Sequence, residues 1–575
     1  MLRRIFSYMK EYKKYAWLAL ICIGVEVVLE IMVPKLMADL IDIGVTNSDV
    51  PYIINKGIQM AVCAVAALIL GVGSARFSAL AGQGLGANIR KAEYEKLQSY
   101  SFSNIDHFSV SSLVTRLTSD VTNIQNAVST GMRPFGRSPV MLIFATTLAF
   151  QINSTLALVF LVALPVLAVL LIIIIINVGP RYGRMQGAVD FVNRCIEENL
   201  TAVRVVKSYV RGDYEIEKFR NVNDNLKNES EKAFGIAVLN MPAMQFVMYS
   251  TILGILLIGG RLINSGQMMI GQLTSFLSYV LLILNSLMMM SNVFLLMTRS
   301  LASAERIMKV IDEPIDITDE NAKDIEVKKG EIEFNHVWFK YKDTAKEYVL
   351  SDVSFHINAG QTVGIIGQTG SSKTTLIQLI PRLYDASKGE IKIDGINVKE
   401  YPVRHLRDAI SVVLQKNTLF SGSLIDNLRW GDENATLDEI KEACSIACVD
   451  EFIDRLPGGF DAEMGQEGVN VSGGQKQRIC IARAILKKPK VLILDDSTSA
   501  VDTATEGKIR NALAKKLPDM TKIIIAQRIS SVCHADQIII MDGGRVDAIG
   551  THESLLKTNK IYQEIYESQK EGADL

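Results

Sequence analysis

The sequence predicts two folds in one chain: an all-α membrane domain of six transmembrane helices over residues 1–315, and an α/β domain over residues 316–575. The membrane domain is predicted from long apolar stretches, because about 20 apolar residues suffice to cross a bilayer. Residues 138–180, for example, contain no charged side chain. After Pro314, short β-rich runs alternate with helical stretches, which indicates an α/β domain.

Each transmembrane helix is predicted from an apolar run that ends at a charge, a turn or a polar break. The uncharged stretch is long enough for two helices, and the polar residues Gln151–Ser154 divide it. The other four predicted spans are Tyr15–Val33, Gly57–Ala75, Phe234–Gly260 and Ile270–Thr298.

The charges at the ends of the spans predict how the chain is oriented. Six spans place both termini on one side, and the basic segment from Arg3 to Lys14 predicts that this side is the cytoplasm. The connections after spans two and four, about residues 82–132 and 181–233, are long, polar and rich in Lys and Arg. We therefore expect both loops to extend into the cytoplasm, and the protein to be a multi-pass protein of the plasma membrane.

The overall charge and the cysteines exclude other classes of protein. The net charge of −1 offers no basic field for nucleic acid, which is not expected as a partner. The seven cysteines form no CxxC pair and none lies near a His at metal-binding spacing. We interpret them as reduced, mostly buried thiols.

A glycine-rich loop follows the predicted strand Thr362–Ile366 and precedes a helical run, which is the context of a phosphate-binding loop. Its backbone N–H groups and the helix N-terminus would hold the phosphates of ATP. Lys373 would neutralise the β- and γ-phosphates, and the Thr374 hydroxyl would bind Mg²⁺. The residue before the lysine is normally Gly and here is Ser372. The loop consists of Gly367, Gln368, Thr369, Gly370, Ser371, Ser372, Lys373, Thr374 and Thr375.

Two further motifs follow the loop in a fixed order. The buried strand Lys490–Leu494 ends in Asp495, a carboxylate suited to Mg²⁺. Between the loop and this strand lies Ser472-Gly473-Gly474-Gln475. In this order the three motifs resemble the ATP-binding-cassette (ABC) family, and the two long cytoplasmic loops resemble those of ABC exporters. The resemblance covers nearly the whole chain.

The resemblance implies roles for further residues. Tyr341 matches the aromatic residue that stacks on adenine, and Gln415 matches the glutamine that reaches Mg²⁺ and couples to the membrane helices. Ser499–Asp502 resembles the loop that communicates across the dimer. Asp496 occupies the position of the catalytic glutamate, and Gln527 occupies that of the switch histidine.

These last two departures predict an ATP site that binds nucleotide and hydrolyses it poorly. The Asp496 carboxylate is withdrawn by roughly 1.5 Å relative to a glutamate, and a misplacement of about 1 Å can cost about a hundredfold in rate. Gln527 cannot take up the protonation or the shape of an imidazole. In the family each ATP lies between one chain's phosphate loop and the other chain's Ser-Gly-Gly-Gln signature, and the signature is intact here.

We therefore expect a heterodimer, like the degenerate-site subunit of heterodimeric bacterial ABC exporters. The partner would be a different half-transporter with the catalytic glutamate and the switch histidine. The expected activity is ATP-driven export of small hydrophobic or amphipathic substrates, drugs or membrane lipids. The alternatives are a homodimeric lipid flippase or an ATP-gated channel on the same scaffold.

Some residues of the membrane domain allow two interpretations. Glu26 and Glu30 share one face of the first span. They would attract a cationic substrate or, as we favour, form an ion pair or hydrogen bonds with other spans or lie near the outer interface. Met288, Met289, Met290 and Met297 line an adaptable cavity or fill a helix interface. The coupling helices that press on the ATP-binding domains are predicted near Phe108–Leu117 and Ser208–Phe219.

Overall fold

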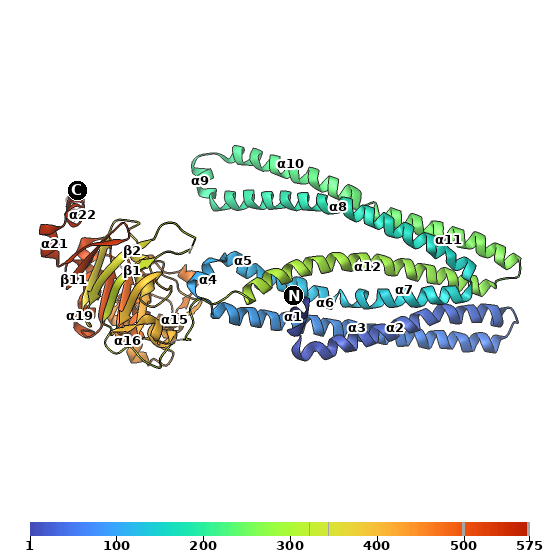
Figure 1. The fold of residues 1–575 in the computed structure, drawn as a ribbon, viewed down its shortest axis with the longest axis horizontal. Helices are drawn as coiled ribbons and strands as arrows, with labels where there is room; N and C mark the ends of the chain where they lie inside the picture. The colour runs from blue at the N-terminus through green and yellow to red at the C-terminus, as the bar shows by residue number, and fades with distance from the viewer. Residues whose placement is uncertain (321, 343, 497–500, 572–575) are drawn as a thin grey trace. The chain divides into compact units, whose positions relative to one another are not determined.

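The computed structural model describes residues 1–320, 322–342, 344–496 and 501–571 of the chain (Figure 1). It contains two compact units. The first consists of Met1–Gln98 and Ser111–Asp312, and the second of Ser99–Val110 and Glu313–Leu575. The sequence predicts a domain boundary between residues 315 and 316. In the structure, Ser99–Val110 of the first cytoplasmic loop also groups with the C-terminal unit, which no local pattern predicted.

The first unit is all helical. Six helical stretches among the described residues are long and apolar enough to cross a membrane: Lys10–Val45, Val50–Gln98, Val110–Ile152, Ser154–Thr201, Gly212–Asn264 and Ile270–Met290. They confirm the six predicted spans. Its helices are α1 Leu2–Ser7, η1 Lys10–Tyr12, α2 Lys13–Asp39, η2 Leu40–Val45, α3 Val50–Gln98, α5 Val110–Thr115, η3 Arg116–Asp120, α6 Val121–Ser129, α7 Met132–Ile152, α8 Ser154–Thr201, α9 Val203–Ser208, α10 Gly212–Ala237, α11 Asn240–Asn264 and α12 Ile270–Ile311.

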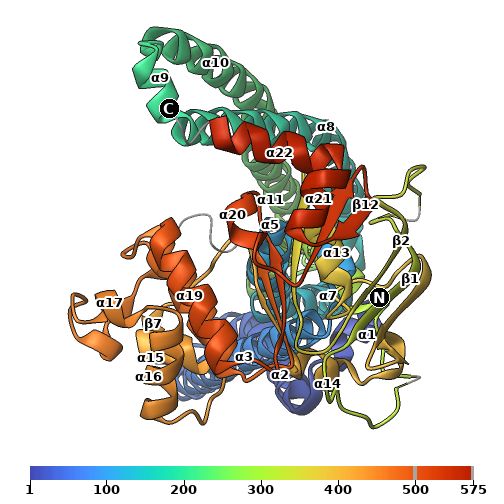
Figure 2. The same ribbon diagram turned by 90° about the vertical axis from the view of Figure 1, so that its left-hand side faces the viewer.

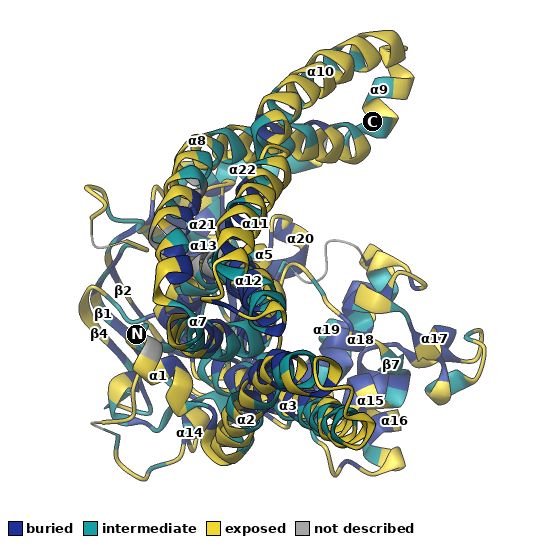
Figure 3. Cartoon of the chain, turned by 90° about the vertical axis from the view of Figure 1, so that its right-hand side faces the viewer, coloured by how far each residue is buried: buried dark blue, intermediate teal, exposed yellow. Residues whose placement is uncertain are grey.

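The transmembrane helices bury apolar side chains against each other and leave others on their outer faces. Ile23 and Val27 of α2 pack with Met141 of α7 and with Phe276 of α12 in one apolar cluster, and Met288 packs at its edge. Many apolar side chains of these helices, such as that of Ile176, are exposed. Figure 3 colours large parts of the long helices as exposed. In a water-soluble protein such surface would be costly, whereas in a bilayer it faces lipid.

Glu26 and Glu30 form ion pairs with a neighbouring helix. The Arg133 guanidinium at the start of α7 donates to Glu26 Oε1 at 2.6 Å, and the Arg137 guanidinium, one turn further, donates to Glu30 Oε1 at 2.6 Å. Arg137 also lies 3.4 Å from Glu26 Oε1. The structure thus favours the second interpretation of the two glutamates, pairing with another span.

The second unit contains a six-stranded sheet in the order β12-β11-β3-β10-β9-β6, in which only β12 is antiparallel to its neighbour. A four-stranded antiparallel sheet, β2-β1-β4-β5, covers an apolar core of this unit. The predicted α/β domain is confirmed. Its strands are β1 Ile332–Phe339, β2 Leu350–Ile357, β3 Thr362–Gly367, β4 Lys388–Ile393, β5 Ile396–Asn397, β6 Ile410–Val413, β7 Gly422–Ser423, β8 Glu463–Met464, β9 Val491–Asp495, β10 Thr521–Ile525, β11 Gln537–Asp542 and β12 Arg545–Gly550.

The helices of this unit gather in part into a lobe beside the sheets. Figure 2 shows α15, α16 and α17 together on one side of the unit, away from β1 and β2. The helices are α4 Phe102–Asp106, α13 Lys373–Leu379, η4 Val398–Glu400, α14 Val403–Asp408, α15 Leu424–Arg429, α16 Leu437–Ile446, α17 Asp450–Ile453, η5 Gly459–Asp461, η6 Gln466–Gly468, α18 Gly473–Leu486, α19 Thr503–Lys516, α20 Ile529–Val532, α21 His552–Thr558 and α22 Lys560–Glu571.

Candidate nucleotide site

Most of the predicted site residues lie together at one edge of the six-stranded sheet, formed by the carboxyl ends of its strands. The glycine-rich loop follows β3, Gln527 follows β10, Asp495 and Asp496 end β9, and Gln415 follows β6. These four strands are parallel neighbours, so their carboxyl ends lie side by side. Ligands of open α/β sheets bind at this edge.

These residues surround a cavity of about 320 Å³. Its described lining comes from the glycine-rich loop and from the ends of the neighbouring strands. The lining residues are Thr369, Gly370, Ser372, Lys373, Thr374, Thr375, Gln415, Asp495, Asp496, Ile525 and Gln527. Ile525 is the one member that the sequence analysis did not select, because an apolar residue at the end of a buried strand carries no chemical signal of its own.

Lys373 lies inside the curve of the glycine-rich loop. Its ammonium donates to the carbonyl oxygens of Gly367 and Gln368, both at 2.8 Å, and to Ser371 Oγ at 3.1 Å. Burial lowers the pKa of Lys373, while the carboxylates of Asp496 and Asp495 oppose this shift. The Lys373 ammonium therefore lies where it would contact the oxygens of a phosphate held by the loop.

Thr374 and Asp495 present adjacent oxygen atoms. The Thr374 hydroxyl donates to Asp495 Oδ1 at 3.2 Å, and Asp495 is 2 % exposed. Burial raises the pKa of the Asp495 carboxyl. A hydroxyl and a carboxylate are oxygen donors of the kind Mg²⁺ prefers. The pair fits this ion and would hold it, and when bound the ion would neutralise negative charge on the phosphates.

Asp496 and Gln527, the two departures from the family pattern, contact each other. The Gln527 side-chain amide donates to Asp496 Oδ2 at 2.9 Å, and the Gln415 amide donates to the same oxygen at 3.4 Å. Burial raises the pKa of Asp496, and the two amide donors act in the opposite direction because they stabilise the ionised form. The residue sits at φ 47°, in the left-handed region.

Ser372 also adopts a left-handed conformation, at φ 70° and ψ 24°. It is the N-cap residue of α13, and its side chain makes no capping hydrogen bond. A side chain is disfavoured at such angles, whereas glycine is not. This backbone conformation is the physical reason why glycine suits the position before the lysine.

Tyr341 lies beside the glycine-rich loop. Its hydroxyl is 2.9 Å from Thr375 Oγ1, and the side chain is 43 % exposed. The ring meets that of Tyr384 at 5.2 Å between centroids, with the planes at 87°. The exposed ring leaves surface on which a base could stack, and Tyr384 is a neighbour that the sequence analysis missed.

The signature Ser472–Gln475 lies elsewhere. Among the described residues that line the cavity, none belongs to the signature. Ser472 is the exposed N-cap of α18, and its hydroxyl accepts from the Gln475 N–H at 3.3 Å. The Gln475 side-chain oxygen accepts from the Ser472 N–H at 2.9 Å, which completes a capping box. Within one chain, the signature and the phosphate loop therefore form separate surfaces.

Ser499 and Ala500 of the predicted communication loop lie outside the described residues. Asp502 is the N-cap of α19 and accepts from the Thr505 N–H at 2.9 Å.

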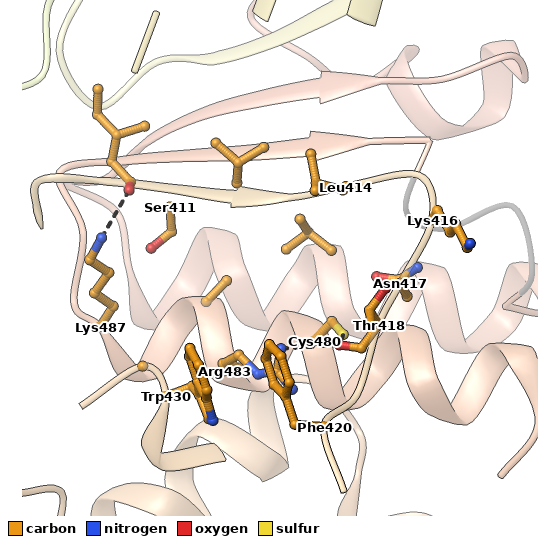
Figure 4. A pocket seen from close by; sticks show the side chains of 15 residues that line it. Ser411, Leu414, Lys416, Asn417, Thr418, Phe420, Trp430, Cys480, Arg483 and Lys487 are labelled. Carbon is orange, nitrogen blue, oxygen red and sulfur yellow. Dashed lines mark hydrogen bonds between the residues drawn. The ribbon is translucent and has the colours of Figure 1, made fainter. Parts of the chain in front are cut away.

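A second cavity of about 320 Å³ lies beyond Gln415, between β6 and α18 (Figure 4). At its edge the rings of Phe420 and Trp430 stack with centroids 4.2 Å apart, and Trp430 is 64 % exposed. The guanidinium of Arg483 is fixed by two hydrogen bonds to Asn427, at 2.8 and 2.9 Å. This aromatic groove is a second surface that the sequence analysis did not identify.

The cytoplasmic loops contain short helices next to the ranges predicted for the coupling segments. In the first loop, the segment that groups with the C-terminal unit contains α4, Phe102–Asp106, which ends before the predicted range Phe108–Leu117 begins. In the second loop, α9 ends at Ser208, where the predicted range Ser208–Phe219 begins. It connects α8 and α10, which lie side by side (Figure 1).

Comparison with known proteins identifies the family. Residues 16–287 match the ABC transporter transmembrane region, and residues 350–499 match the ABC transporter family. The uncharacterized ABC transporter ATP-binding protein YfiB of Bacillus subtilis is 37% identical over 575 residues, covering 100% of both chains. The chain belongs to the ABC transporter family.

Two further relatives indicate its branch. The ATP-dependent lipid A-core flippase of Pseudomonas putida is 32% identical, over 98% of this chain and 95% of its own length. A bacterial Atm1-family ABC exporter, solved with ATP bound, shares the fold with a TM-score of 0.83 and 22% identity, over 97% of this chain and 99% of its own. The protein is thus an ABC exporter half-transporter of the plasma membrane, with six spans and a cytoplasmic ATPase domain.

Proposed function

We propose that this ABC half-transporter exports hydrophobic or amphipathic molecules, drugs or lipids, as one half of a heterodimer. In this proposal its own ATP site binds MgATP and hydrolyses it slowly, and its signature completes a competent site on a different partner subunit. The observation that carries the proposal is the contact between Asp496 and Gln527. The two departures from the family pattern form one hydrogen-bonded pair.

The geometry of Asp496 supports slow hydrolysis. A general base must accept a proton from the attacking water through a carboxylate oxygen within hydrogen-bond reach of that water. Two amides, from Gln527 and Gln415, direct hydrogen bonds at the same carboxylate oxygen. Both bonds hold this oxygen toward the protein and occupy acceptor positions that the attacking water would need. The side chain is also shorter than a glutamate, so its carboxylate reaches less far toward a γ-phosphate.

The signature supports a role toward another chain. Ser472 is exposed and stands at the N-terminus of α18, a helix of 14 residues. The partial positive charge and free N–H groups of a helix N-terminus favour phosphate. Because the signature does not line this chain's own cavity, the phosphate it serves would belong to a nucleotide on the partner subunit.

The membrane domain supports an uncharged or amphipathic cargo. The cluster of Glu26, Glu30, Arg133 and Arg137 carries no net charge, and its carboxylates already pair with guanidinium groups. It therefore offers little attraction for a simple cation. Met288 packs at the edge of the helix core, as predicted for a residue that fills a helix interface, and Met290 is 43 % exposed.

A homodimeric lipid flippase is the second candidate, favoured by the relative named as a lipid A-core flippase. The ATPase rate of this chain, purified in lipid nanodiscs without a second subunit, separates the two. We expect a low rate that rises when a different half-transporter is co-expressed. A robust, lipid-stimulated rate from the homodimer would defeat the heterodimer proposal.

Asp496→Ala tests the degenerate site itself. In the heterodimer this change should reduce turnover less than removal of the partner's catalytic glutamate, because the slow site contributes little of the hydrolysis. An equal loss from both substitutions would mean that the two sites contribute alike.

A further inference from the structure

Tyr384 contacts two other segments of the C-terminal unit, helix α4 and the segment that contains Tyr341. It lies between α13 and β4 and is 8 % exposed. Its hydroxyl donates to Asp106 Oδ2 of α4 at 2.7 Å. Its ring lies 6.0 Å from that of Phe102 in α4 and 5.2 Å from that of Tyr341, measured between centroids. One side chain thus contacts both α4 and the aromatic residue beside the glycine-rich loop.

From Tyr384, contacts lead through Tyr341 to the glycine-rich loop. The Tyr341 hydroxyl is 2.9 Å from Thr375 Oγ1, and Thr375 is the last residue of the glycine-rich loop and belongs to α13. The rings of Tyr341 and Tyr384 meet edge to face, at 87° between their planes. A displacement of the Tyr341 ring therefore changes the packing around Tyr384 directly, because the buried Tyr384 ring has few alternative positions.

The short helix α4 is held in place by further contacts within the C-terminal unit. Ser101 and Asn104 form a capping box at its start. The Asn104 side-chain amide donates to the Pro314 carbonyl oxygen at 2.8 Å, and His107 lies 2.9 Å from Glu313. Along the chain, α4 begins four residues after the end of α3, which carries the second transmembrane span. A shift of α4 is therefore passed to α3 through the backbone.

We propose that Tyr384 is a positioning residue through which occupancy of the adenine site is passed to α4, by its ring contact with Tyr341 and its hydrogen bond to Asp106. The inference rests on the proposed role of Tyr341 in stacking on adenine. A base stacked on Tyr341 fixes the position of that ring. Tyr384 then sets the position of Asp106 and Phe102, and with them α4.

The chemistry of the hydrogen bond suits this role. Burial and the Asp106 carboxylate raise the pKa of Tyr384 well above its usual range, so the hydroxyl stays protonated and remains a donor at every physiological pH. A hydrogen bond to a charged acceptor is worth roughly tenfold in an equilibrium. Its loss should therefore be measurable in the response of α4 to nucleotide, while Tyr341 and the phosphate loop keep all their atoms.

The test is hydrogen–deuterium exchange of the full-length protein in nanodiscs, with and without saturating ATP in EDTA, together with the ATP affinity of each variant. In the wild type, ATP should slow exchange in the peptide that contains Phe102–Asp106. Tyr384→Phe should reduce this slowing by up to about tenfold, with ATP affinity unchanged. Asp106→Asn keeps an acceptor but removes the charge, and should give an intermediate loss.

Tyr401→Phe is the matched control. Tyr401 is also a fully buried tyrosine of this unit, and its hydroxyl donates to the Ile393 carbonyl oxygen at 2.9 Å. It therefore loses a comparable buried hydrogen bond but should leave the response of α4 intact. An equal loss in both tyrosine variants, or an unchanged response in Tyr384→Phe, overturns the proposal.

Tyr341→Ala separates this inference from the proposed adenine site. If this variant binds ATP as tightly as the wild type, the adenine role of Tyr341 fails, and the premise of the inference fails with it. If ATP affinity falls in Tyr341→Ala while Tyr384→Phe responds like the wild type, the adenine site stands and only the role of Tyr384 is refuted.

Discussion

Replacing Ser372 with glycine should stabilise the ATPase domain, although it removes a side chain. Ser372 holds φ 70° in the phosphate loop, and its hydroxyl makes no capping hydrogen bond. The left-handed conformation costs a residue with a Cβ atom about 1–2 kcal/mol relative to glycine. The substitution therefore relieves strain without losing a capping interaction.

The gain in the folded state is partly offset in the unfolded state. Glycine adds conformational freedom to the unfolded chain, which costs about 0.5–1 kcal/mol. The net gain is then about 0.5–1 kcal/mol, and because 1 kcal/mol shifts the melting temperature of a domain this large by about 2–4 °C, the midpoint should rise by about 1–4 °C.

Thermal unfolding of the full-length protein in detergent, followed by intrinsic fluorescence, measures this shift. Ser371→Gly is the matched control one residue away. Ser371 is 3 % exposed, does not adopt a positive φ, and accepts a hydrogen bond from Lys373 at 3.1 Å. Glycine there should lower the midpoint. If both glycine variants moved the midpoint in the same direction, strain at Ser372 would not be the explanation.

Three further substitutions address the division of labour between the two ATP sites. Lys373→Ala should weaken ATP binding at this chain's own site by about 10–100-fold, the worth of a hydrogen bond to a charged group, and leave some turnover at the partner's site; complete loss of ATPase with undiminished binding contradicts this. Ser472→Ala should strongly reduce steady-state ATPase, and a change confined to this chain's own nucleotide affinity would show the assignment to be wrong. Burial raises the pKa of Asp495 above 3.8, and Mg²⁺ requires the ionised carboxylate. The Mg²⁺-dependent part of ATP binding should therefore weaken as the pH falls through that raised pKa. Asp495→Asn should show no such weakening in a titration from pH 8 to pH 5, which is about the stable range of most proteins.

The position of the nucleotide site could be predicted because each motif is tied to a strand. The glycine-rich loop and Asp495 each follow an apolar β-rich run, and carboxyl ends of parallel strands meet at one edge. The sequence also marked Asp496 and Gln527 as departures, but as two separate ones. Their contact depends on β9 and β10 being neighbours in register, with Ile525 opposite Asp495. Strand order depends on the whole sheet and cannot be predicted from either motif alone.

The segment of the first loop that groups with the ATPase domain was harder to predict. Helix α4 has five residues, too few for an apolar periodicity to mark it. Its contacts with Tyr384, Pro314 and Glu313 join residues more than 200 positions apart. A local pattern could predict that the loop is helical and polar, but not which few of its residues pack against the ATPase domain.

The contacts within the charge cluster of the membrane domain also could not be predicted from a local pattern, and they bear on the proposed cargo. Arg133 and Arg137 share the i, i+4 spacing of Glu26 and Glu30, so both pairs could be recognised as faces of helices, but only the adjacency of α2 and α7 matches them. Removing one member of a buried ion pair leaves an uncompensated charge, at a cost of about 3–5 kcal/mol. The ion pairs therefore fix α2 against α7, although Oε2 of Glu26 and Oε2 of Glu30 have no hydrogen-bond partner among the described residues. If the cargo is hydrophobic or amphipathic, as proposed, its selection depends mainly on apolar contact, because these four charges already pair with one another.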